Sequence, residues 1–210
     1  MDESTPAGLT AEELAARHKE KMRRQKEVQD ARVAAATREK GLLMVHTGNG
    51  KGKSTAAFGL MLRAAGHGLR IGLVQFTKGT WKTGEDAALA RFADLIDRHV
   101  MGEGFTWDTQ DRDRDIAAAT AAWEKAQAMM ADPAYHLIVL DELNIVLRYG
   151  YLEVEAVVAG LQARRLDLHV LVTGRNAKAP LIEAADLVTD FVAVKHPFDA
   201  GIKAQRGIEF

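Results

Sequence analysis

Residues 47–55 read Thr-Gly-Asn-Gly-Lys-Gly-Lys-Ser-Thr and follow an apolar run, Leu-Leu-Met-Val, at residues 42–45. A short buried strand, a glycine-rich turn and Lys-Ser at the start of a helix form the pattern of a phosphate-binding loop. The glycines let backbone N–H groups point inward, the helix N-terminus contributes a partial positive charge, and Lys53 contributes a full one. The pattern predicts a nucleoside triphosphate as ligand, without deciding which of its bonds is broken.

The loop departs from the general form of this motif at one position. Counted back from Gly52, Lys53 and Ser54, the form G-x-x-x-x-G-K-[ST] expects its first glycine at position 47, where this chain has Thr47. Gly48 comes one residue later. Either Thr47 replaces the first glycine or the loop is one residue tighter, and the sequence leaves both open.

Length and composition are those of an ordinary α/β protein. The chain has 210 residues, a formal net charge of −1 and no cysteine, which excludes disulfides, thiolate metal sites and a cysteine nucleophile. The balanced charge gives no argument for binding nucleic acid, and no apolar run is long enough for a membrane-spanning helix. The N-terminus lacks the apolar core of a secretory signal, so we expect a cytoplasmic protein.

The first 40 residues differ from the rest of the chain. Residues 10–38 are highly charged, contain no Gly or Pro and begin with a capping-box pattern, Thr-Ala-Glu-Glu, so a long helix is expected. Six Lys or Arg residues lie between positions 17 and 26, which suits a solvated helix or an arm that covers an anionic ligand or a partner subunit. We predict a charged N-terminal arm over residues 1–40 and a phosphate-loop nucleotide-binding α/β domain over residues 41–210.

Apolar strands alternate with helices beyond residue 41, which predicts a parallel sheet with crossover helices. Strands are expected at residues 42–46, 70–76, 98–101, 136–140, 168–172 and 187–194. Helices are expected at residues 53–65, 85–93, 112–131, 154–161 and 179–185. Ligands of such sheets bind at the carboxyl ends of the strands, where the chemically interesting residues of this chain also lie.

Polar residues at these strand ends complete a candidate nucleotide site. Ser54 would supply a hydroxyl to Mg²⁺, and Asp141-Glu142, directly after a buried strand, would hold the metal through one carboxylate, directly or through water. Arg175 and Lys51 are candidate phosphate contacts, with surface ion pairing an equal alternative for Arg175.

No side chain stands out as a catalytic nucleophile. The seven histidines include no pair at metal-ligand spacing, and a structural role is expected for His46 and His196. No Ser-His-Asp arrangement can be argued from the spacing. The site is therefore expected to work by positioning and by neutralising charge.

Two aromatic residues, Phe105 and Trp107, lie two positions apart on a segment that begins with Gly104. Burial in the core is the ordinary explanation for such residues. Beside a nucleotide site they would instead present a flat apolar surface to a planar ligand.

Together these segments resemble the ATP:corrinoid adenosyltransferases of the cobalamin-biosynthesis type. The likeness covers nearly the whole chain, including the charged N-terminal helix. It is carried by Thr-Gly-Asn-Gly-Lys-Gly-Lys-Ser-Thr-Ala-Ala-Phe-Gly (47–59), Val-Gln-Phe-Thr-Lys-Gly (74–79), Gly-Phe-Thr-Trp-Asp-Thr-Gln (104–110), Val-Leu-Asp-Glu-Leu (139–143), Thr-Gly-Arg (173–175) and the tail over residues 194–209. Ser54 stands where the family usually has Thr, and either hydroxyl can bind Mg²⁺.

The resemblance implies a three-layer, mostly parallel α/β fold of the RecA-like phosphate-loop type, an extended N-terminal helix and a homodimer. It implies transfer of the 5′-deoxyadenosyl group of ATP to the Co(I) of a reduced corrinoid, with release of triphosphate, in adenosylcobalamin biosynthesis and corrinoid salvage. ATP would lie reversed in the loop relative to kinases, and a flavoprotein or flavin would supply electrons.

The resemblance also assigns roles to individual residues. Lys53 would stabilise charge on the leaving triphosphate, Ser54 and Glu142 would hold Mg²⁺ with Asp141 as second choice, and the arm would cover a corrinoid site, that of the other subunit. Phe105 and Trp107 would pack against the corrinoid. The expected ATP contacts are Gly48, Asn49, Gly50, Lys51, Gly52, Lys53, Ser54, Thr55 and Arg175.

Two other classes of function remain open from the residues alone. A phosphate-loop kinase or ATPase would break the terminal phosphoanhydride and give ADP. A nucleotide-dependent switch, with its basic helix on a partner, would hydrolyse ATP slowly at most. The product formed from ATP separates both from adenosyl transfer.

Overall fold

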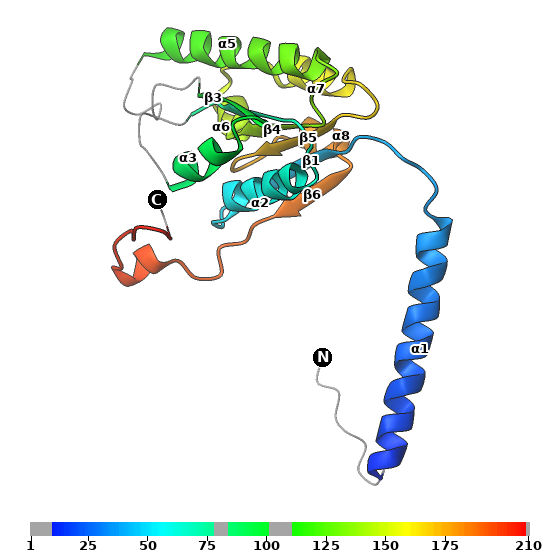
Figure 1. Ribbon diagram of the computed structural model, residues 1–210. Coiled ribbons are helices and arrows are strands. Elements are labelled where there is room, and N and C mark those ends of the chain that lie inside the picture. The colour runs from blue at the N-terminus through cyan, green and yellow to red at the C-terminus, as the bar shows by residue number, and fades with distance from the viewer. Residues whose placement is uncertain (1–9, 78–83, 101–110, 209–210) are drawn as a thin grey trace. The chain divides into compact units, whose positions relative to one another are not determined.

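The computed structural model describes residues 10–77, 84–100 and 111–208. Its centre is a six-stranded sheet in the order β3-β2-β4-β5-β1-β6 (Figure 1). All five neighbouring pairs of strands are parallel, as expected from the alternation of strands and helices. The predicted α/β class is confirmed.

The strands are β1 Leu43–Thr47, β2 Ile71–Gln75, β3 Ile96–Val100, β4 Leu137–Asp141, β5 His169–Thr173 and β6 Leu187–Asp190. The helices are α1 Ala11–Ala35, α2 Lys53–Gly66, α3 Gly84–Leu89, α5 Arg112–Ala131, α6 Leu143–Tyr149, α7 Val154–Gln162 and α8 Ala179–Ala184, with 3₁₀ turns η1 Ala90–Phe92 and η2 Pro197–Ala200.

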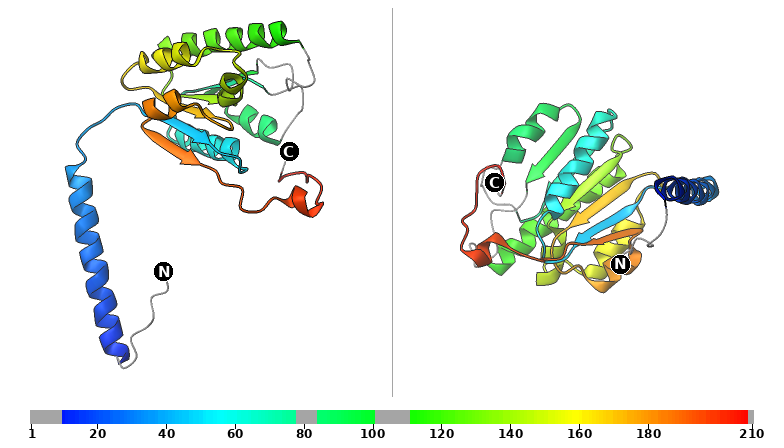
Figure 2. Two further views of the ribbon diagram at one scale, coloured as in Figure 1. Left: turned by 180° about the vertical axis from the view of Figure 1, so that it is seen from behind. Right: turned by 90° about the horizontal axis from the view of Figure 1, so that it is seen from below.

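Helices cover both faces of the sheet and make three layers (Figures 1 and 2). Alternate residues of β4 separate the two apolar clusters, because successive side chains of a strand point to opposite faces. Ile138 and Leu140 belong to the cluster that includes residues of α5, α6, α7 and α8. Leu137 and Val139 belong to the cluster that includes residues of α2 and Leu89 of α3.

Several bounds differ from the sequence-based expectations: β3 begins two residues earlier, and the helix expected over residues 85–93 is α3 followed by η1. Helix α6 was not expected, because seven residues between a strand and the turn at Gly150 give too short an apolar pattern. Strand β6 ends at Asp190, four residues before the expected end at Val194. Among the strands that the structure describes, β6 pairs with β1, whose last residue, Thr47, lies opposite Asp190. Beyond that pair β1 turns into the phosphate loop, so the pairing of β6 with β1 ends there.

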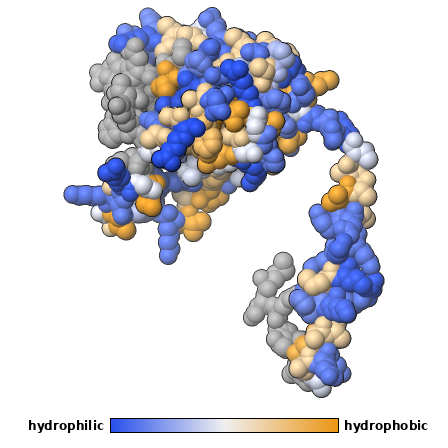
Figure 3. Space-filling model, in the orientation of Figure 1, coloured by the Kyte–Doolittle hydropathy of each residue, from blue (hydrophilic) through white to orange (hydrophobic). Residues whose placement is uncertain are grey.

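The chain divides into two compact units, Met1–Glu39 and Lys40–Phe210. The first contains α1, whose N-cap Thr10 forms the expected capping box with Glu13. None of the residues of α1 is buried, and Figure 3 shows mainly hydrophilic side chains along it. Ion pairs on its surface include Arg23 with Glu20 and Glu27. Among the described residues, no helix has the length and apolar character needed to span a membrane.

Candidate functional site

The candidate site lies at the carboxyl ends of β1, β5 and β4, which are consecutive in the sheet. The loop after β1, residues 48–52, leads into α2 at Lys53. Asp141 is the last residue of β4, and Thr173 is the last residue of β5. The parallel sheet therefore brings the phosphate loop and the acidic pair of residues 141 and 142 to one edge, as expected from their places in the sequence.

The structure decides how the loop manages without a glycine at position 47. Thr47 is the last residue of β1, so its backbone is extended, and its Oγ1 accepts a hydrogen bond from the Ala177 N–H at 3.0 Å. The turn begins at Gly48, which has φ +92°. A Cβ at position 48 would collide with the Asp190 carboxylate and the backbone of Phe191. Thr47 thus belongs to the strand, and the turn begins one residue later, at Gly48.

The loop leaves the start of α2 open for an anion. Gly52, the N-cap of α2, has φ +104° and no side chain to cap the helix. The first N–H groups of a helix lack partners within the helix, and they carry its partial positive charge. Gly50 is held from the other side, because its N–H donates to the Phe191 carbonyl at 2.5 Å.

Lys53 closes the loop from within. Its side chain is 6% exposed, and Nζ donates to the carbonyls of Gly48 at 2.7 Å and Gly50 at 2.6 Å. Burial lowers the pKa of Lys53, and the positive charge of Arg175 lowers it further, whereas the carboxylate of Glu142 opposes both effects. The Lys53 ammonium group thus lies at the centre of the loop, where phosphate oxygens would replace the carbonyls as partners.

Asp141 is buried and accepts three hydrogen bonds. Its Oδ1 accepts from Ser54 Oγ and Thr173 Oγ1, both at 2.8 Å, and its Oδ2 accepts from Gln75 Nε2 at 3.0 Å. The direct effect of Asp141 is to orient the hydroxyl of Ser54.

Glu142 follows in a different environment. Its φ is +63°, a left-handed conformation that is uncommon outside glycine, and its N–H donates to Thr173 Oγ1 at 3.0 Å. Burial, followed by the charge of Asp141, raises the pKa of Glu142 to about 7, against the opposing charges of Lys53 and Arg175. A cation beside this carboxyl group would favour its ionised form.

These side chains suit Mg²⁺ bound together with a phosphate group. No group of three His, Cys, Asp or Glu residues able to hold a metal occurs in the part of the chain that the structure describes. Mg²⁺ is usually bound through one or two carboxylates, several waters and substrate phosphates, without an all-protein cage. Ser54 Oγ donates a hydrogen bond to Asp141, so the lone pairs of this oxygen remain available for a cation. Glu142, the residue after Asp141, offers a carboxyl group as a further ligand.

The remaining expected site residues divide into described and undescribed ones. Arg175 is exposed after β5, and its charge acts on both Lys53 and Glu142, which places it near the loop. Lys51 and Asn49 are exposed residues of the loop. Phe105 and Trp107 lie outside the described residues.

Asn144 is a buried residue of this site to which the sequence analysis gave no role. It is fully buried, and its Nδ2 donates to the carbonyls of Gly174 at 2.9 Å and His46 at 3.3 Å. It thus ties the start of α6 to the ends of β5 and β1. A buried asparagine just after a strand end was the available signal, but it does not distinguish a structural from a ligand-binding role.

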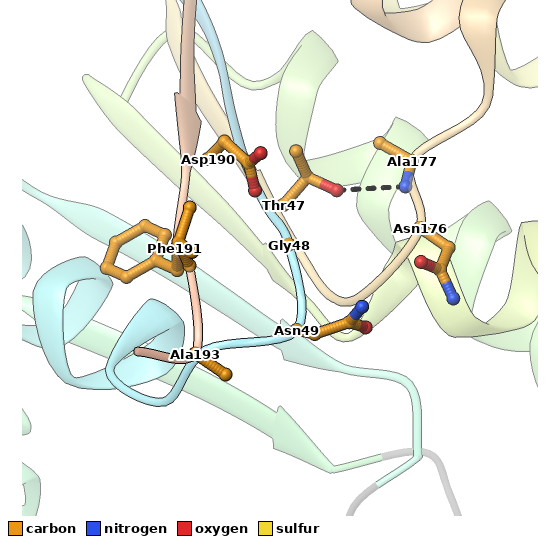
Figure 4. A pocket seen from close by; sticks show the side chains of 9 residues that line it. Thr47, Gly48, Asn49, Asn176, Ala177, Asp190, Phe191 and Ala193 are labelled. Carbon is orange, nitrogen blue, oxygen red and sulfur yellow. Dashed lines mark hydrogen bonds between the residues drawn. The ribbon is translucent and has the colours of Figure 1, made fainter. Parts of the chain in front are cut away.

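A pocket of about 430 Å³ adjoins the phosphate loop (Figure 4). Asn49 and Asn176 contribute amides to its lining, and Asp190 contributes a carboxylate. His46, in β1, is half-buried, and its ring makes an edge-to-face contact with Phe191, with 5.2 Å between the ring centroids; burial lowers the pKa of His46. Asn176 and Asp190 were not singled out from the sequence, although both lie at or just after strand ends on the same edge of the sheet.

Comparison with known proteins gives a match over almost the entire chain. Residues 39–210 match the family model described as ATP:corrinoid adenosyltransferase BtuR/CobO/CobP. Residues 10–33 match a second model, described as Cob(I)alamin adenosyltransferase N terminal.

Curated relatives agree with the family models. A corrinoid adenosyltransferase of Pseudomonas aeruginosa is 58% identical over 194 residues, which cover 92% of this chain and 96% of the relative. One from Sinorhizobium is 49% identical and covers 100% of this chain and 99% of the relative. The corrinoid adenosyltransferase CobA of Salmonella typhimurium is 46% identical, over 92% and 98% of the two chains. This chain belongs to the ATP:corrinoid adenosyltransferase family.

Proposed function

We propose that this protein transfers the 5′-deoxyadenosyl group of ATP to the Co(I) of a reduced corrinoid and releases triphosphate, in adenosylcobalamin biosynthesis and corrinoid salvage. The observation that carries the proposal is a buried lysine held at the centre of an uncapped helix N-terminus, in a chain whose relatives are named corrinoid adenosyltransferases. Such a loop suits a polyphosphate that keeps its negative charge as it leaves.

The electron pair for the new bond comes from the corrinoid. Co(I) attacks C5′ of ATP, the cobalt–carbon bond forms, and the bond between C5′ and the triphosphate oxygen breaks. The triphosphate departs with that electron pair, so no protein nucleophile is needed. Fixed positive groups around the leaving oxygens lower the barrier, because they are in place before the charge develops.

The phosphate loop supplies those positive groups. Lys53 would exchange its bonds to loop carbonyls for bonds to phosphate oxygens, and Arg175 would approach from the end of β5. Backbone N–H groups at the start of α2 would bind the same oxygens. The residues proposed to contact ATP are Gly48, Asn49, Gly50, Lys51, Gly52, Lys53, Ser54, Thr55 and Arg175.

Mg²⁺ would be held by the Ser54 hydroxyl and the Glu142 carboxylate together with phosphate oxygens. When bound, it supplies additional neutralisation of the triphosphate charge. Asp141 is the second choice as a ligand, because its oxygens already accept hydrogen bonds from Ser54 and two further donors. Its proposed role is to orient Ser54.

The corrinoid would lie against Phe105 and Trp107, under the N-terminal arm of the other subunit of a homodimer in the cytoplasm. The apolar surface of the aromatic rings would favour cobalt without its lower axial ligand, which eases reduction to Co(I). A flavoprotein or free flavin is the proposed electron donor.

Incubation with ATP, Mg²⁺ and chemically reduced cobalamin tests the proposal directly. Triphosphate and adenosylcobalamin are expected in equal amounts, with the change in the corrinoid spectrum that accompanies formation of a cobalt–carbon bond. A parallel reaction without reductant should give neither product. ADP as the main product with an unchanged corrinoid spectrum would instead indicate a kinase or ATPase, and slow hydrolysis alone would indicate a switch.

A further inference from the structure

A chain of polar side chains crosses the carboxyl edge of the sheet from α3 to the phosphate loop. It consists of Asp86, Arg98, Gln75, Asp141 and Ser54, and we call these five residues the polar relay. They come from α3, β3, β2, β4 and α2 in that order. Because β3, β2 and β4 are neighbours in the sheet, each member reaches the next without an intervening element.

Every link of the polar relay is a direct contact. Arg98 Nη2 lies 2.8 Å from Asp86 Oδ1, and Arg98 Nε donates to Gln75 Oε1 at 2.8 Å. Gln75 Nε2 donates to Asp141 Oδ2 at 3.0 Å. The final contact is the 2.8 Å bond from Ser54 Oγ to Asp141 Oδ1.

The chemistry of Arg98 fixes the direction of these bonds. A guanidinium group only donates hydrogen bonds, so Gln75 must turn its carbonyl oxygen toward Arg98 and its amide NH₂ toward Asp141. A carboxylate only accepts them, so Ser54 must turn its proton toward Asp141. The lone pairs of the Ser54 oxygen then remain free for a cation or for a donor on the ligand.

Burial makes this directionality effective. Gln75 is 2% exposed and Asp141 is 5% exposed, so water competes poorly for their hydrogen bonds. If Arg98 were lost, the Gln75 oxygen would lose its donor, and only the bond from Nε2 to Asp141 would still hold the amide in place. Gln75 would then hold Asp141 less firmly, and the position of the Asp141 carboxylate under Ser54 would be less well defined.

We propose that Arg98 and Gln75 are positioning residues for Mg²⁺-dependent nucleotide binding, acting through Asp141 on the hydroxyl of Ser54. This inference rests on the proposed function only in assigning Mg²⁺ and ATP to the phosphate loop. Outer-shell partners of metal ligands typically change metal affinity about 10–100-fold when removed. Arg98 is two contacts further out than Asp141, so its effect belongs at the lower end of that range.

The alternative is that Arg98 only stabilises the packing of β3 against β2. The chain offers a matched control for this alternative. Arg70 pairs with Asp97 at 2.8 Å, and this pair joins the starts of β2 and β3, away from the phosphate loop. Arg70→Met removes an arginine–aspartate pair between the same two strands and leaves the polar relay intact.

The test is the dissociation constant of ATP for the full-length protein without corrinoid, measured by calorimetry in saturating Mg²⁺ and again in excess EDTA. The dissociation constant in EDTA divided by that in Mg²⁺ expresses how much Mg²⁺ strengthens ATP binding. We expect Arg98→Met to reduce this ratio about tenfold, mainly by weakening binding in Mg²⁺, and Arg70→Met to leave it within about twofold. Gln75→Met, close in size, breaks the same relay from the other side and should reproduce the effect.

Arg98→Lys adds a further readout, since it keeps a positive charge and a donor. It should recover part of the lost ratio. An unchanged ratio in both Arg98→Met and Gln75→Met would overturn the proposal, as would equal losses with and without Mg²⁺ or a wild-type ratio of one. The products formed from ATP with reduced cobalamin decide the proposed function separately.

Discussion

Lys53 has the same task in the free protein and in the proposed reaction, which is to place a positive charge inside the phosphate loop. Lys53→Met keeps the length of the side chain and removes the charge. We expect kcat/KM for ATP to fall about 100-fold or more, since loss of one group that stabilises developing negative charge costs about 100–1,000-fold. Lys125→Met on α5, a half-buried residue, is the control for removal of a lysine charge outside the loop, and a loss below about threefold in Lys53→Met would contradict the role.

Glu142 makes the stability of the metal-free protein depend on pH. Its pKa is raised from 4.5 to about 7 in the folded state, so between these values the folded protein holds a proton that the unfolded chain has released. The stabilisation is present at low pH and is lost as pH rises through 7. Relative to Glu142→Gln, the wild type should lose on the order of 2 kcal/mol of unfolding free energy between pH 5 and pH 8.

Urea unfolding of both proteins at several pH values measures this difference. Glu155→Gln, an exposed residue of α7, should follow the wild type. Parallel curves for the wild type and Glu142→Gln would mean that the carboxyl group ionises normally.

The phosphate loop could be predicted from the sequence. Which of Asp141 and Glu142 contacts Ser54, and which is left for a metal, could not. The loop is recognisable because its glycines and Lys-Ser occur at fixed spacing. The roles of the two acids depend on the backbone, since Asp141 ends the strand and Glu142 adopts a left-handed turn. The place of Thr47 was likewise open until its pairing with Asp190 showed an extended backbone.

At the scale of elements, hydrogen bonds from the buried Asn144 side chain add to the apolar packing that holds α6 on the sheet. Asn144→Ala removes the hydrogen bonds to the carbonyls of Gly174 and His46 and leaves a small cavity. Unsatisfied buried groups cost about 1–3 kcal/mol each, but the substitution also removes the buried Asn144 Oδ1, which has no partner among the described residues, so a loss of about 1–2 kcal/mol in unfolding free energy is expected from urea titration. Gln162→Ala, on the exposed end of α7, should change it by less than about 0.5 kcal/mol.

The elements themselves were largely predictable, and the exceptions have local causes. Buried parallel strands are recognisable in the sequence as continuous apolar runs. Helix α5 was predicted with the bounds it has in the structure, Arg112–Ala131. Helix α6 is too short to show a helical period. The end of β6 depends on where β1, the strand it pairs with, turns into the phosphate loop. Residues 187–194 by themselves contain no signal for that position.

At the scale of the whole molecule, the parallel sheet gathers residues that are far apart in sequence. The Asp141 carboxylate of β4 accepts hydrogen bonds from Gln75 of β2, Thr173 of β5 and Ser54 of α2. One carboxylate thus connects three strands and a helix. The sequence predicted that these strand ends share an edge. It did not predict the polar relay, because the pairing of β2 with β3 brings Arg98 to Gln75, and no motif records that pairing.

The arm is a separate compact unit, Met1–Glu39, and none of the residues of α1 is buried. We therefore predict that a chain of residues 40–210 keeps its free energy of unfolding within about 1 kcal/mol and its ATP dissociation constant within about twofold. If the arm covers the corrinoid, kcat/KM for reduced cobalamin should fall about tenfold or more, because the ligand loses one wall of its site. Equal losses for ATP and corrinoid would make the arm a structural element only.

A mixing experiment decides whether the arm acts across a dimer. The shortened chain has an intact phosphate loop and no arm, whereas full-length Lys53→Met has an arm and a defective loop. Each alone should be nearly inactive at low corrinoid concentration. In a mixture, heterodimers would place the arm of the Lys53→Met subunit over the corrinoid site of the subunit with the intact loop. Activity should therefore reappear. It should follow the fraction of heterodimer, measured by light scattering and affinity capture. Heterodimers without activity would confine the arm to its own subunit, and the absence of heterodimers would contradict the proposed homodimer.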